Sequence, residues 1–255
     1  MLTVAQIPIT SPIALNSSMG TIMHGVLMEC IGTDYASYLH SQNIRPYTQQ
    51  IYFDKDAKVN IWRITTLNQQ AYDNIILPLQ ELIKPTLKLH LKQKNIDICA
   101  QNLDIIKQSS YEKIANEHFM NQSICRKYQM HMLTPTNFKT NGQYMLYPQI
   151  EQILKSLFNR WNEHSGSFSL DDSETVRHLA DHIHITGYNI SSKRFPMESI
   201  NIPAFAGSIN LSIAGPEALA RVANILLDYV DYSGIGIKTA LGMGRCYCTM
   251  MKGNS

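Results

Sequence analysis

The sequence predicts an α+β protein made of two tandem ferredoxin-like (βαββαβ) domains, residues 1–121 and 122–255. Strand and helix patterns follow one another in that order in both halves, and a glycine-rich segment closes the second half. Hydrophobic residues are 44% of the 255 and charged residues 16%, a balance that excludes intrinsic disorder. The net charge of +2 excludes a histone-like polycation but leaves room for a local basic patch.

The second half has the clearer pattern. Alternation over residues 124–132 predicts a strand that enters a turn at Thr134-Pro135-Thr136. Apolar side chains at three- and four-residue spacing predict a helix over 150–161 and another over 219–230, which starts behind Pro216. Three further strands are expected at residues 182–188, 205–213 and 246–250.

The first half repeats this order with weaker signals. A strand broken by prolines lies within Val4–Leu15, and an apolar stripe from Ile22 to Ile31 predicts a helix that ends at Gly32. A short second helix is expected from Asp34 to about His40, with Thr33 as its cap. The later elements are a hairpin (Tyr47–Phe53, Val59–Thr65), a helix near Tyr72–Ile83 that contains Pro78, two strands (Leu87–Leu91, Ile96–Cys99) and a polar, partly helical connector (Ser110–Met120).

The cysteines and the N-terminal residues bear on location. Five cysteines occur without a Cys-x-x-Cys pair, so neither a zinc ribbon nor a thioredoxin motif is available. The first 28 residues contain no Asp, Glu, Lys or Arg, but Pro8 and Pro12 interrupt them and no basic region leads them. Neither a signal peptide nor a spanning helix is therefore expected. We expect reduced thiols in a cytoplasmic protein.

The glycine-rich segment combines small residues with cations: Gly234, Gly236, Lys238, Thr239, Gly242, Gly244 and Arg245. Glycine permits left-handed backbone and close approach to a ligand, and successive amides suit phosphate oxygens. Ile237 stands where a Walker loop needs glycine, and Thr239 stands where a dinucleotide fingerprint needs its third glycine. Both nucleotide-cofactor readings therefore fail. The alternative to a phosphate-binding segment is a turn that only closes the fold.

Four segments carry a family resemblance. They are LTPTNFK at 133–139, LFNRWN at 157–162, FAGSINL at 205–211 and YSGIGIKTALGMG at 232–244. In this order they resemble the CRISPR-associated repeat-processing endoribonucleases, the sixth Cas protein family of the RAMP superfamily. The match covers residues 124–249, whereas residues 1–123 agree in element order and in one histidine near the first helices.

The resemblance implies a metal-independent endoribonuclease that cuts CRISPR precursor transcripts within the repeat. In that family the RNA's own 2′-hydroxyl attacks, which leaves a 2′,3′-cyclic phosphate and a 5′-hydroxyl end. The reaction needs a base, an acid and a cation that stabilises the phosphorane. No metal or other cofactor is expected. The implied partner is repeat RNA; subunits of a CRISPR effector complex are further candidates, and monomer and homodimer are both open.

Candidate catalytic residues follow from the same resemblance. His40 is expected to transfer protons, because the family often keeps a histidine there and imidazole titrates near neutral pH. The alternative is a surface histidine at a helix C-terminus. Tyr35 or Tyr38 is a candidate for a second proton relay or for orienting the phosphate, and Arg45 for the transition-state cation. His24 competes for a role, although we favour a helix-flank histidine.

RNA binding is assigned to locally clustered cations at strand or loop positions of the second half, together with the glycine-rich segment. These cations are Arg126, Lys127, Lys139, Lys193, Arg194, Lys238 and Arg245. Ordinary solvated surface is the alternative. His178, Asp181, His182 and His184 suggest a metal cluster, but we expect His182 and His184 on one strand face without further ligands. Two other functions remain open: a non-cleaving RNA-binding CRISPR subunit, and a small-molecule enzyme that binds phosphate through the glycines.

Overall fold

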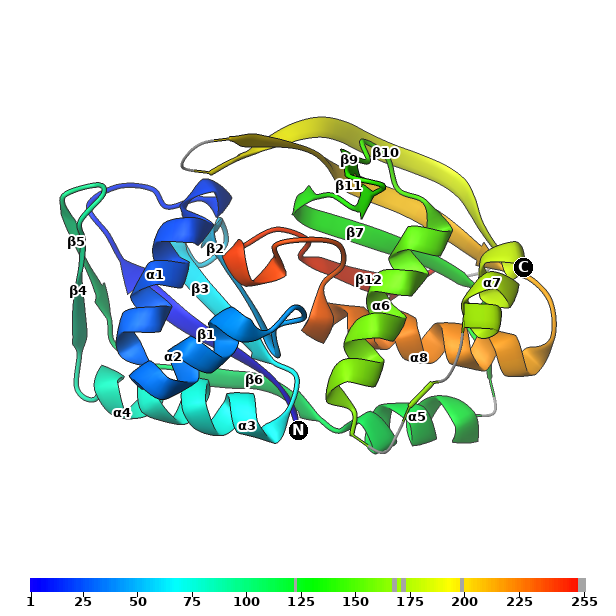
Figure 1. Cartoon of the computed structure of the whole chain (residues 1–255), viewed down its shortest axis with the longest axis horizontal. Coiled ribbons are helices and arrows are strands. Elements are labelled where there is room, and N and C mark those ends of the chain that lie inside the picture. The colour runs from blue at the N-terminus through cyan, green and yellow to red at the C-terminus, as the bar shows by residue number, and fades with distance from the viewer. Residues whose placement is uncertain (122, 167–168, 171–172, 198–199, 252–255) are drawn as a thin grey trace. The chain divides into compact units, whose positions relative to one another are not determined.

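The computed structural model describes residues 1–121, 123–166, 169–170, 173–197 and 200–251. They form two compact units, each with its own β-sheet (Figure 1). The N-terminal unit comprises Met1–Ser109 and also takes in Lys238–Gly242 of the glycine-rich segment. The C-terminal unit comprises Ser110–Ile237 and the chain from Met243 on. Within the described part of the chain, no helix is long and apolar enough to cross a membrane.

The N-terminal unit is a ferredoxin-like sheet with an added hairpin. Its elements are β1 (Leu2–Thr10), η1 (Ser17–Met19), α1 (Gly20–Cys30), α2 (Thr33–Ser41), β2 (Tyr47–Asp54), β3 (Val59–Thr66), α3 (Gln69–Ala71), a π-helical turn η2 (Tyr72–Ile76), α4 (Leu77–Ile83), β4 (Leu87–Leu91), β5 (Ile96–Ala100), β6 (Asp104–Ser109) and η3 (Thr239–Leu241). The antiparallel order β2-β3-β1-β6 is the ferredoxin-like arrangement. The β4–β5 hairpin joins β1 only at Ile9 and Thr10.

The strand that completes this sheet was not predicted. The predicted strands Leu87–Leu91 and Ile96–Cys99 do return to the sheet, through the pairing of β5 with β1, but β6, which pairs with β1 from Leu2 to Gln6, was not predicted. In β6 the side chains alternate between exposed and half-buried, and none is fully buried. The segment therefore lacks the apolar face by which a strand is recognised in a sequence.

The helix that contains Pro78 is continuous across it. Residues 69–83 form α3, the π-helical turn η2 and α4, with Pro78 in the first turn of α4. Proline lacks an N–H, and a wider π-helical turn absorbs such a break in the α-helical hydrogen-bond ladder. Asn68 caps the start, where its side chain accepts a hydrogen bond from the amide of Ala71 at 2.8 Å.

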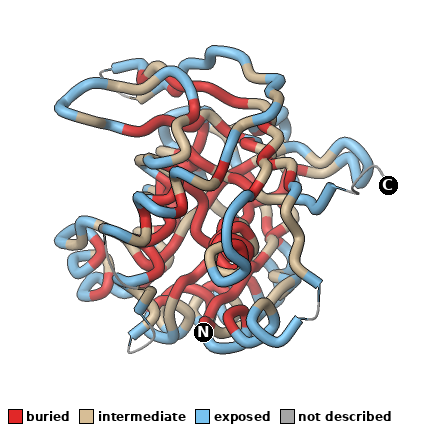
Figure 2. Tube along the Cα trace, turned by 90° about the vertical axis from the view of Figure 1, so that its right-hand side faces the viewer, coloured by how far each residue is buried: buried red, intermediate tan, exposed pale blue. Residues whose placement is uncertain are grey.

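The core of the N-terminal unit lies between the sheet and its helices. Ile7, Trp62, Met23 and Leu27 are fully buried there, and Ala240 of the glycine-rich segment belongs to the same cluster. Figure 2 colours the trace by burial and shows that buried residues gather in the interior and exposed residues in the loops. One residue from the far end of the sequence thus completes this core.

The C-terminal unit has the predicted ferredoxin-like topology. Its elements are α5 (Tyr111–Met120), β7 (Lys127–Thr136), β8 (Lys139–Thr140), β9 (Gln143–Tyr144), α6 (Ile150–His164), α7 (Ser173–His182), β10 (Ile183–Pro196), β11 (Asn201–Ile213), α8 (Glu217–Ser233) and β12 (Cys246–Met250). The sheet order is β10-β11-β7-β12, all antiparallel. With both units described, the predicted α+β class with two ferredoxin-like units is confirmed.

The strand predicted over residues 182–188 is confirmed as part of β10, but it begins at Ile183 rather than at His182. His182 is the last residue of α7, and its Nδ1 lies 2.7 Å from the carbonyl oxygen of His178. Its ring also fills the space where a Cβ on Gly215 would stand. His184 is on β10, so the two rings do not share a strand face. Within the described ranges, no His, Cys, Asp and Glu side chains are grouped so as to hold a metal ion.

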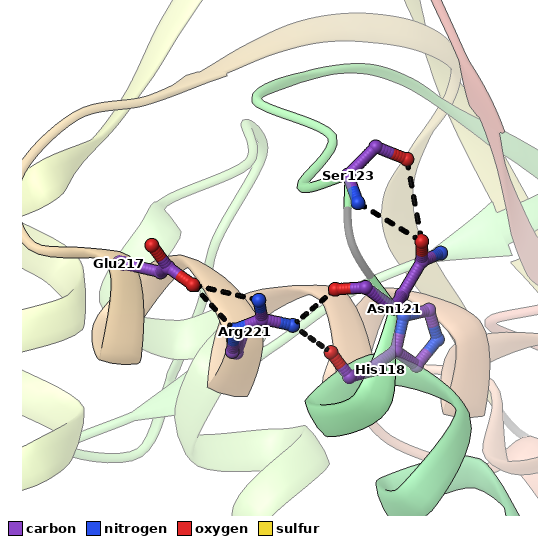
Figure 3. A network of polar contacts seen from close by, with 5 residues as sticks. All are labelled: His118, Asn121, Ser123, Glu217 and Arg221. Atoms are coloured by element: carbon purple, nitrogen blue, oxygen red, sulfur yellow. Dashed lines mark hydrogen bonds and ion pairs between the residues drawn. The ribbon is translucent and has the colours of Figure 1, made fainter.

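Helix α5 belongs to the C-terminal unit, so the division falls at Ser109 and Ser110 rather than at the expected 121 and 122. Arg221 of α8 donates to the carbonyl oxygens of His118 (2.6 Å) and Asn121 (2.9 Å) at the end of α5 (Figure 3). A guanidinium suits these carbonyls because the C-terminal end of a helix is partly negative. At the other end of α5, Tyr111 packs edge-on against Trp161 at 4.7 Å.

We expect Arg221→Met to lower the free energy of unfolding by about 1–3 kcal/mol, because two carbonyls lose a charged donor. Glu217→Gln is the matched control, since it removes only the ion pair between Arg221 and a carboxylate that is 63% exposed. Such exposed pairs contribute less than about 1 kcal/mol. Urea denaturation measures both, and equal losses would contradict the capping role of Arg221.

Candidate active site

Two short helices and the strand after them bring the candidate catalytic residues together. Helix α1 carries His24, α2 ends with His40 in its last turn, and β2 begins with Tyr47. The α2 helix begins at Thr33 with Gly32 as its N-cap, so the expected cap at Thr33 was off by one residue. The sharp change of direction at Ile31–Gly32, both extended, places α2 beside the end of α1.

His24, His40 and Tyr47 form the centre of this site. The hydroxyl of Tyr47 lies 2.8 Å from Nδ1 of His24, and the two rings are nearly parallel, 14° apart. The rings of His24 and His40 meet edge to face, with 6.2 Å between centroids. His40 is exposed, His24 is half-buried and Tyr47 is fully buried. The structure therefore brings the expected histidine and its competitor into one cluster.

Burial and positive charge set the protonation of His24. Burial is the largest cause that lowers the pKa of His24 to about 4, and Arg45 and His40 act in the same direction. Burial also raises the pKa of Tyr47, and Arg45 opposes that rise. At neutral pH His24 is accordingly a neutral imidazole beside a protonated phenol.

Arg45 lies at the edge of this cluster. Its Nε donates to the carbonyl oxygen of Leu39 at 3.2 Å, in the last turn of α2. Its positive charge acts to lower the pKa of both His24 and Tyr47. The arginine is thus bonded to the end of α2 and brings a fixed positive charge to the histidines and to Tyr47.

The two candidate tyrosines differ in accessibility. Their rings stack with 5.5 Å between centroids, but Tyr35 is 7% exposed and Tyr38 is 37% exposed. The hydroxyl of Tyr35 is buried and has no hydrogen-bond partner among the described residues. Burial raises the pKa of Tyr35. Of the pair, Tyr38 is the one open to a large ligand.

Tyr47 was missed because nothing in its sequence context marks it. It is one aromatic at the start of a predicted strand, and its partner His24 lies 23 residues earlier. Only the packing of α1 against β2 reveals the contact. A buried tyrosine is recognisable in a sequence, but the group that its hydroxyl meets is not.

The motifs LTPTNFK and LFNRWN contact the glycine-rich segment and fix its backbone. Arg160 donates to the carbonyl oxygen of Gly236 at 3.0 Å, and the amide of Ile237 donates to the carbonyl oxygen of Asn137 at 3.0 Å. A Cβ at Gly236 would stand 2.2 Å from that Asn137 oxygen, so only glycine fits there. LTPTNFK, LFNRWN and the glycine-rich segment therefore meet in the C-terminal unit.

The backbone amides of the four paired glycines all donate hydrogen bonds within the protein. Those of Gly234, Gly236, Gly242 and Gly244 donate to Val230, Ser156, Thr239 and Pro135. Thr239 is buried, whereas Lys238 is exposed in a left-handed conformation with a φ of 57°. Lys238 is thus the residue of the segment that projects to solvent.

Gln49 fixes the segment 238–242 within the N-terminal unit. Its Nε2 donates to the carbonyl oxygens of Gly20 (2.7 Å) and Ala240 (3.1 Å), and its Oε1 accepts from Trp62 Nε1 at 2.8 Å. A Cβ at Gly20 would stand 2.0 Å from the carbonyl oxygen of Leu241. Glycine at residue 20 thus allows the segment to touch the start of α1, one turn before His24.

The other candidate RNA-binding cations lie on the C-terminal unit. Lys127, Lys139, Lys193 and Arg194 are exposed, and Arg126 and Arg245 are half-buried. Lys193 and Arg194 are neighbours on β10, so their side chains leave opposite faces of the β10–β11 hairpin. Lys139 lies 5.6 Å from the ring centroid of Tyr144. These cations are thus spread over several elements of the unit.

The low pKa of His24 predicts how stability depends on pH. The ordinary value is 6.5 and the folded value about 4, so between these values only the unfolded chain binds the proton. The folded state therefore keeps its full stability with respect to His24 above pH 6.5 and loses stability as the pH falls from 6.5 toward 4. We expect His24→Gln to flatten the loss of urea stability between pH 7 and pH 4.5. Parallel curves for the two proteins would contradict the burial of a neutral His24.

The comparisons with known proteins agree with one another. Residues 130–246 match the family model for CRISPR-associated endoribonuclease Cas6. Curated proteins of that name include one from Streptococcus thermophilus, 28% identical over 87% of each chain. Another, from Mycobacterium tuberculosis, is 26% identical over 89% of this chain and 71% of its own.

Solved structures support the fold. A Cas6 product complex superposes with a TM-score of 0.80 at 18% identity, covering 98% of this chain and 100% of that one. A second Cas6 product complex gives 0.76 at 20% identity, covering 98% and 99%. Sequence, topology and the four motifs point the same way: over residues 130–246 the chain is similar to the Cas6 family of CRISPR-associated endoribonucleases, and its fold is that of solved Cas6 structures.

Proposed function

We propose that this chain cuts CRISPR precursor RNA within its repeats and so releases guide RNAs. Its relatives are named endoribonucleases, which supports RNA cleavage. The observation that carries the proposal is the pair of imidazoles, His24 and His40, 6.2 Å apart on the N-terminal unit. Two such rings beside a guanidinium provide the proton transfer and charge stabilisation that RNA self-cleavage requires.

The nucleophile in this proposal is the 2′-hydroxyl next to the scissile phosphate. Its oxygen attacks phosphorus, the bond to the 5′-oxygen breaks, and the products are a 2′,3′-cyclic phosphate and a 5′-hydroxyl end. A base takes the 2′ proton, and an acid supplies a proton to the leaving oxygen. The protein therefore has to supply protons and charge but no nucleophile, and we propose a metal-independent reaction.

His40 is assigned the proton transfer. It is exposed in the last turn of α2, so it is open to RNA. Nδ1 of His24 is engaged by the hydroxyl of Tyr47 at 2.8 Å, which leaves His24 less suited to act as a base. Its Nε2 is the ring nitrogen left to face a phosphate oxygen.

Arg45 and Tyr38 take supporting roles. Arg45 places a permanent positive charge beside the histidines, where it would stabilise the phosphorane. Tyr38 and His40 are two residues apart on a helix and so face different sides. Tyr38 is therefore proposed to contact the RNA, and Tyr35 to pack beneath it.

RNA is proposed to bind through the exposed cations of the C-terminal unit and through Lys238. Their side chains reach phosphates without reading sequence, as most protein contacts to nucleic acids do. The buried residues of the glycine-rich segment shape the turn that presents Lys238.

We expect wild-type protein to cut an end-labelled repeat RNA in EDTA, and His40→Ala to slow cutting by about 10²–10⁴-fold, the usual contribution of a general acid or base. Binding should be retained, because His40 is one exposed side chain. A 2′-deoxy nucleotide at the cut should abolish cleavage, since it removes the nucleophile.

Other outcomes of this assay separate the alternatives. Cutting that survives the deoxy substitution would overturn the 2′-hydroxyl mechanism. Tight binding of several repeats without any cutting by the wild type would favour a non-cleaving RNA-binding subunit.

We expect the double variant Lys193→Ala, Arg194→Ala to weaken RNA binding and to reduce the salt dependence of affinity. Each phosphate contact contributes roughly 0.7–0.9 to the slope of log K against log salt, so the slope should fall by about 1–2. Lys92→Ala, Lys94→Ala is the matched control, a pair of exposed lysines in the β4–β5 turn. Equal slopes for the two variants would remove Lys193 and Arg194 from the RNA-binding surface.

A further inference from the structure

Tyr47 is a buried polar group to which the proposed reaction assigns no role. It is the first residue of β2, pairs with Thr66 of β3 and has 0% of its surface exposed. Its ring fills the core, so phenylalanine would pack equally well there. Its hydroxyl, however, reaches Nδ1 of His24 at 2.8 Å.

The groups around this hydroxyl set the direction of its hydrogen bond. The positive charge of Arg45 acts on the phenol of Tyr47 and favours an orientation in which a lone pair of the phenol oxygen faces the guanidinium. The phenol proton is then left for Nδ1 of His24. The raised pKa of Tyr47 and the lowered pKa of His24 agree with this, since the phenol keeps its proton and the imidazole stays neutral.

A neutral imidazole carries one proton, and the acceptor role of Nδ1 assigns it to Nε2. The hydrogen bond thus runs from the phenol of Tyr47 to Nδ1 of His24, with the charge of Arg45 beside it. The Nε2–H group is then the donor that His24 has left for a ligand. Arg45 is itself anchored on the carbonyl oxygen of Leu39 in α2, the helix that carries His40.

We propose that Tyr47 is a positioning residue that holds His24 as the Nε2–H tautomer, so that His24 donates a hydrogen bond to the scissile phosphate rather than acting as the base. This inference rests on the proposed function. It also separates the two histidines: His40 moves protons and His24 stabilises charge. Arg45, His40 and Tyr35 are the titratable or charged groups that act on the pair formed by His24 and Tyr47.

The test is Tyr47→Phe, which removes only the hydroxyl. Without it, either nitrogen of His24 can carry the proton. We expect single-turnover cleavage to fall about tenfold to a hundredfold, less than the 10²–10³-fold loss typical when an oxyanion donor is removed outright. RNA affinity should not change. Tyr52→Phe is the matched control on the same strand, because its hydroxyl meets Gln6 and not His24.

The ring nitrogens give a readout that a merely structural role would not move. In the wild type at pH 7, ¹⁵N chemical shifts of His24 should show a protonated Nε2 and an unprotonated Nδ1. In Tyr47→Phe the two shifts should move toward each other, and the pKa of His24 should rise, because the neutral ring loses a donor. In a His24→Gln background, Tyr47→Phe should have no further effect on the rate.

The outcomes are distinguishable. If the wild type cuts no repeat RNA, the proposed function is wrong, and the proposed role of Tyr47 is wrong as well. If cutting requires His40 but is unchanged in Tyr47→Phe, the function stands and this inference is overturned. A wild-type His24 protonated on Nδ1 overturns it as well.

Discussion

The buried amide of Gln49 is the contact on which the candidate site depends. It bonds at once to the start of α1 (Gly20), to β3 (Trp62) and to the glycine-rich segment (Ala240). Without the amide, the indole N–H of Trp62 would be a buried donor that has lost its acceptor, at a cost of about 1–3 kcal/mol. Gln49 follows Tyr47 by two residues, and His24 follows Gly20 by four. The same side chain therefore sets the distance between the two members of the histidine–tyrosine pair.

Glycine is needed where backbones touch. At Gly20 and Gly236 an added Cβ would overlap a carbonyl oxygen, at 2.0 Å and 2.2 Å. The first contact lets the glycine-rich segment touch α1, and the second joins it to Asn137 in the C-terminal unit. This gives Gly236, one of the paired glycines, a structural role beyond any contact with phosphate.

Features that depend on local residue patterns could be predicted from the sequence. The amphipathic helices and alternating strands predicted both βαββαβ units, and a resemblance singled out His40. What it missed depends on contacts between distant residues or on weak patterns. Strand β6 has no buried side chain to mark it. Helix α7 ends at His182 and strand β10 starts at the next residue, so the alternation of the strand gives no sign of where the helix ends. His24 was ranked low because the apolar stripe beside it explains a flank position, and its lowered pKa comes from burial and Arg45. Tyr47 carries no local signal at all.

The inclusion of Lys238–Gly242 in the N-terminal unit has a consequence for biosynthesis. A ribosome delivers α1, α2 and β2 early, but Ala240, which completes their core and binds Gln49, emerges only after the whole of Ser110–Ile237. Until then Gly20 and Gln49 lack one of their partners. The nascent chain therefore holds His24 and His40 before the scaffold that aligns them is finished. Maturation of the site is delayed until the C-terminal unit, which carries most of the candidate RNA-binding cations, has been made.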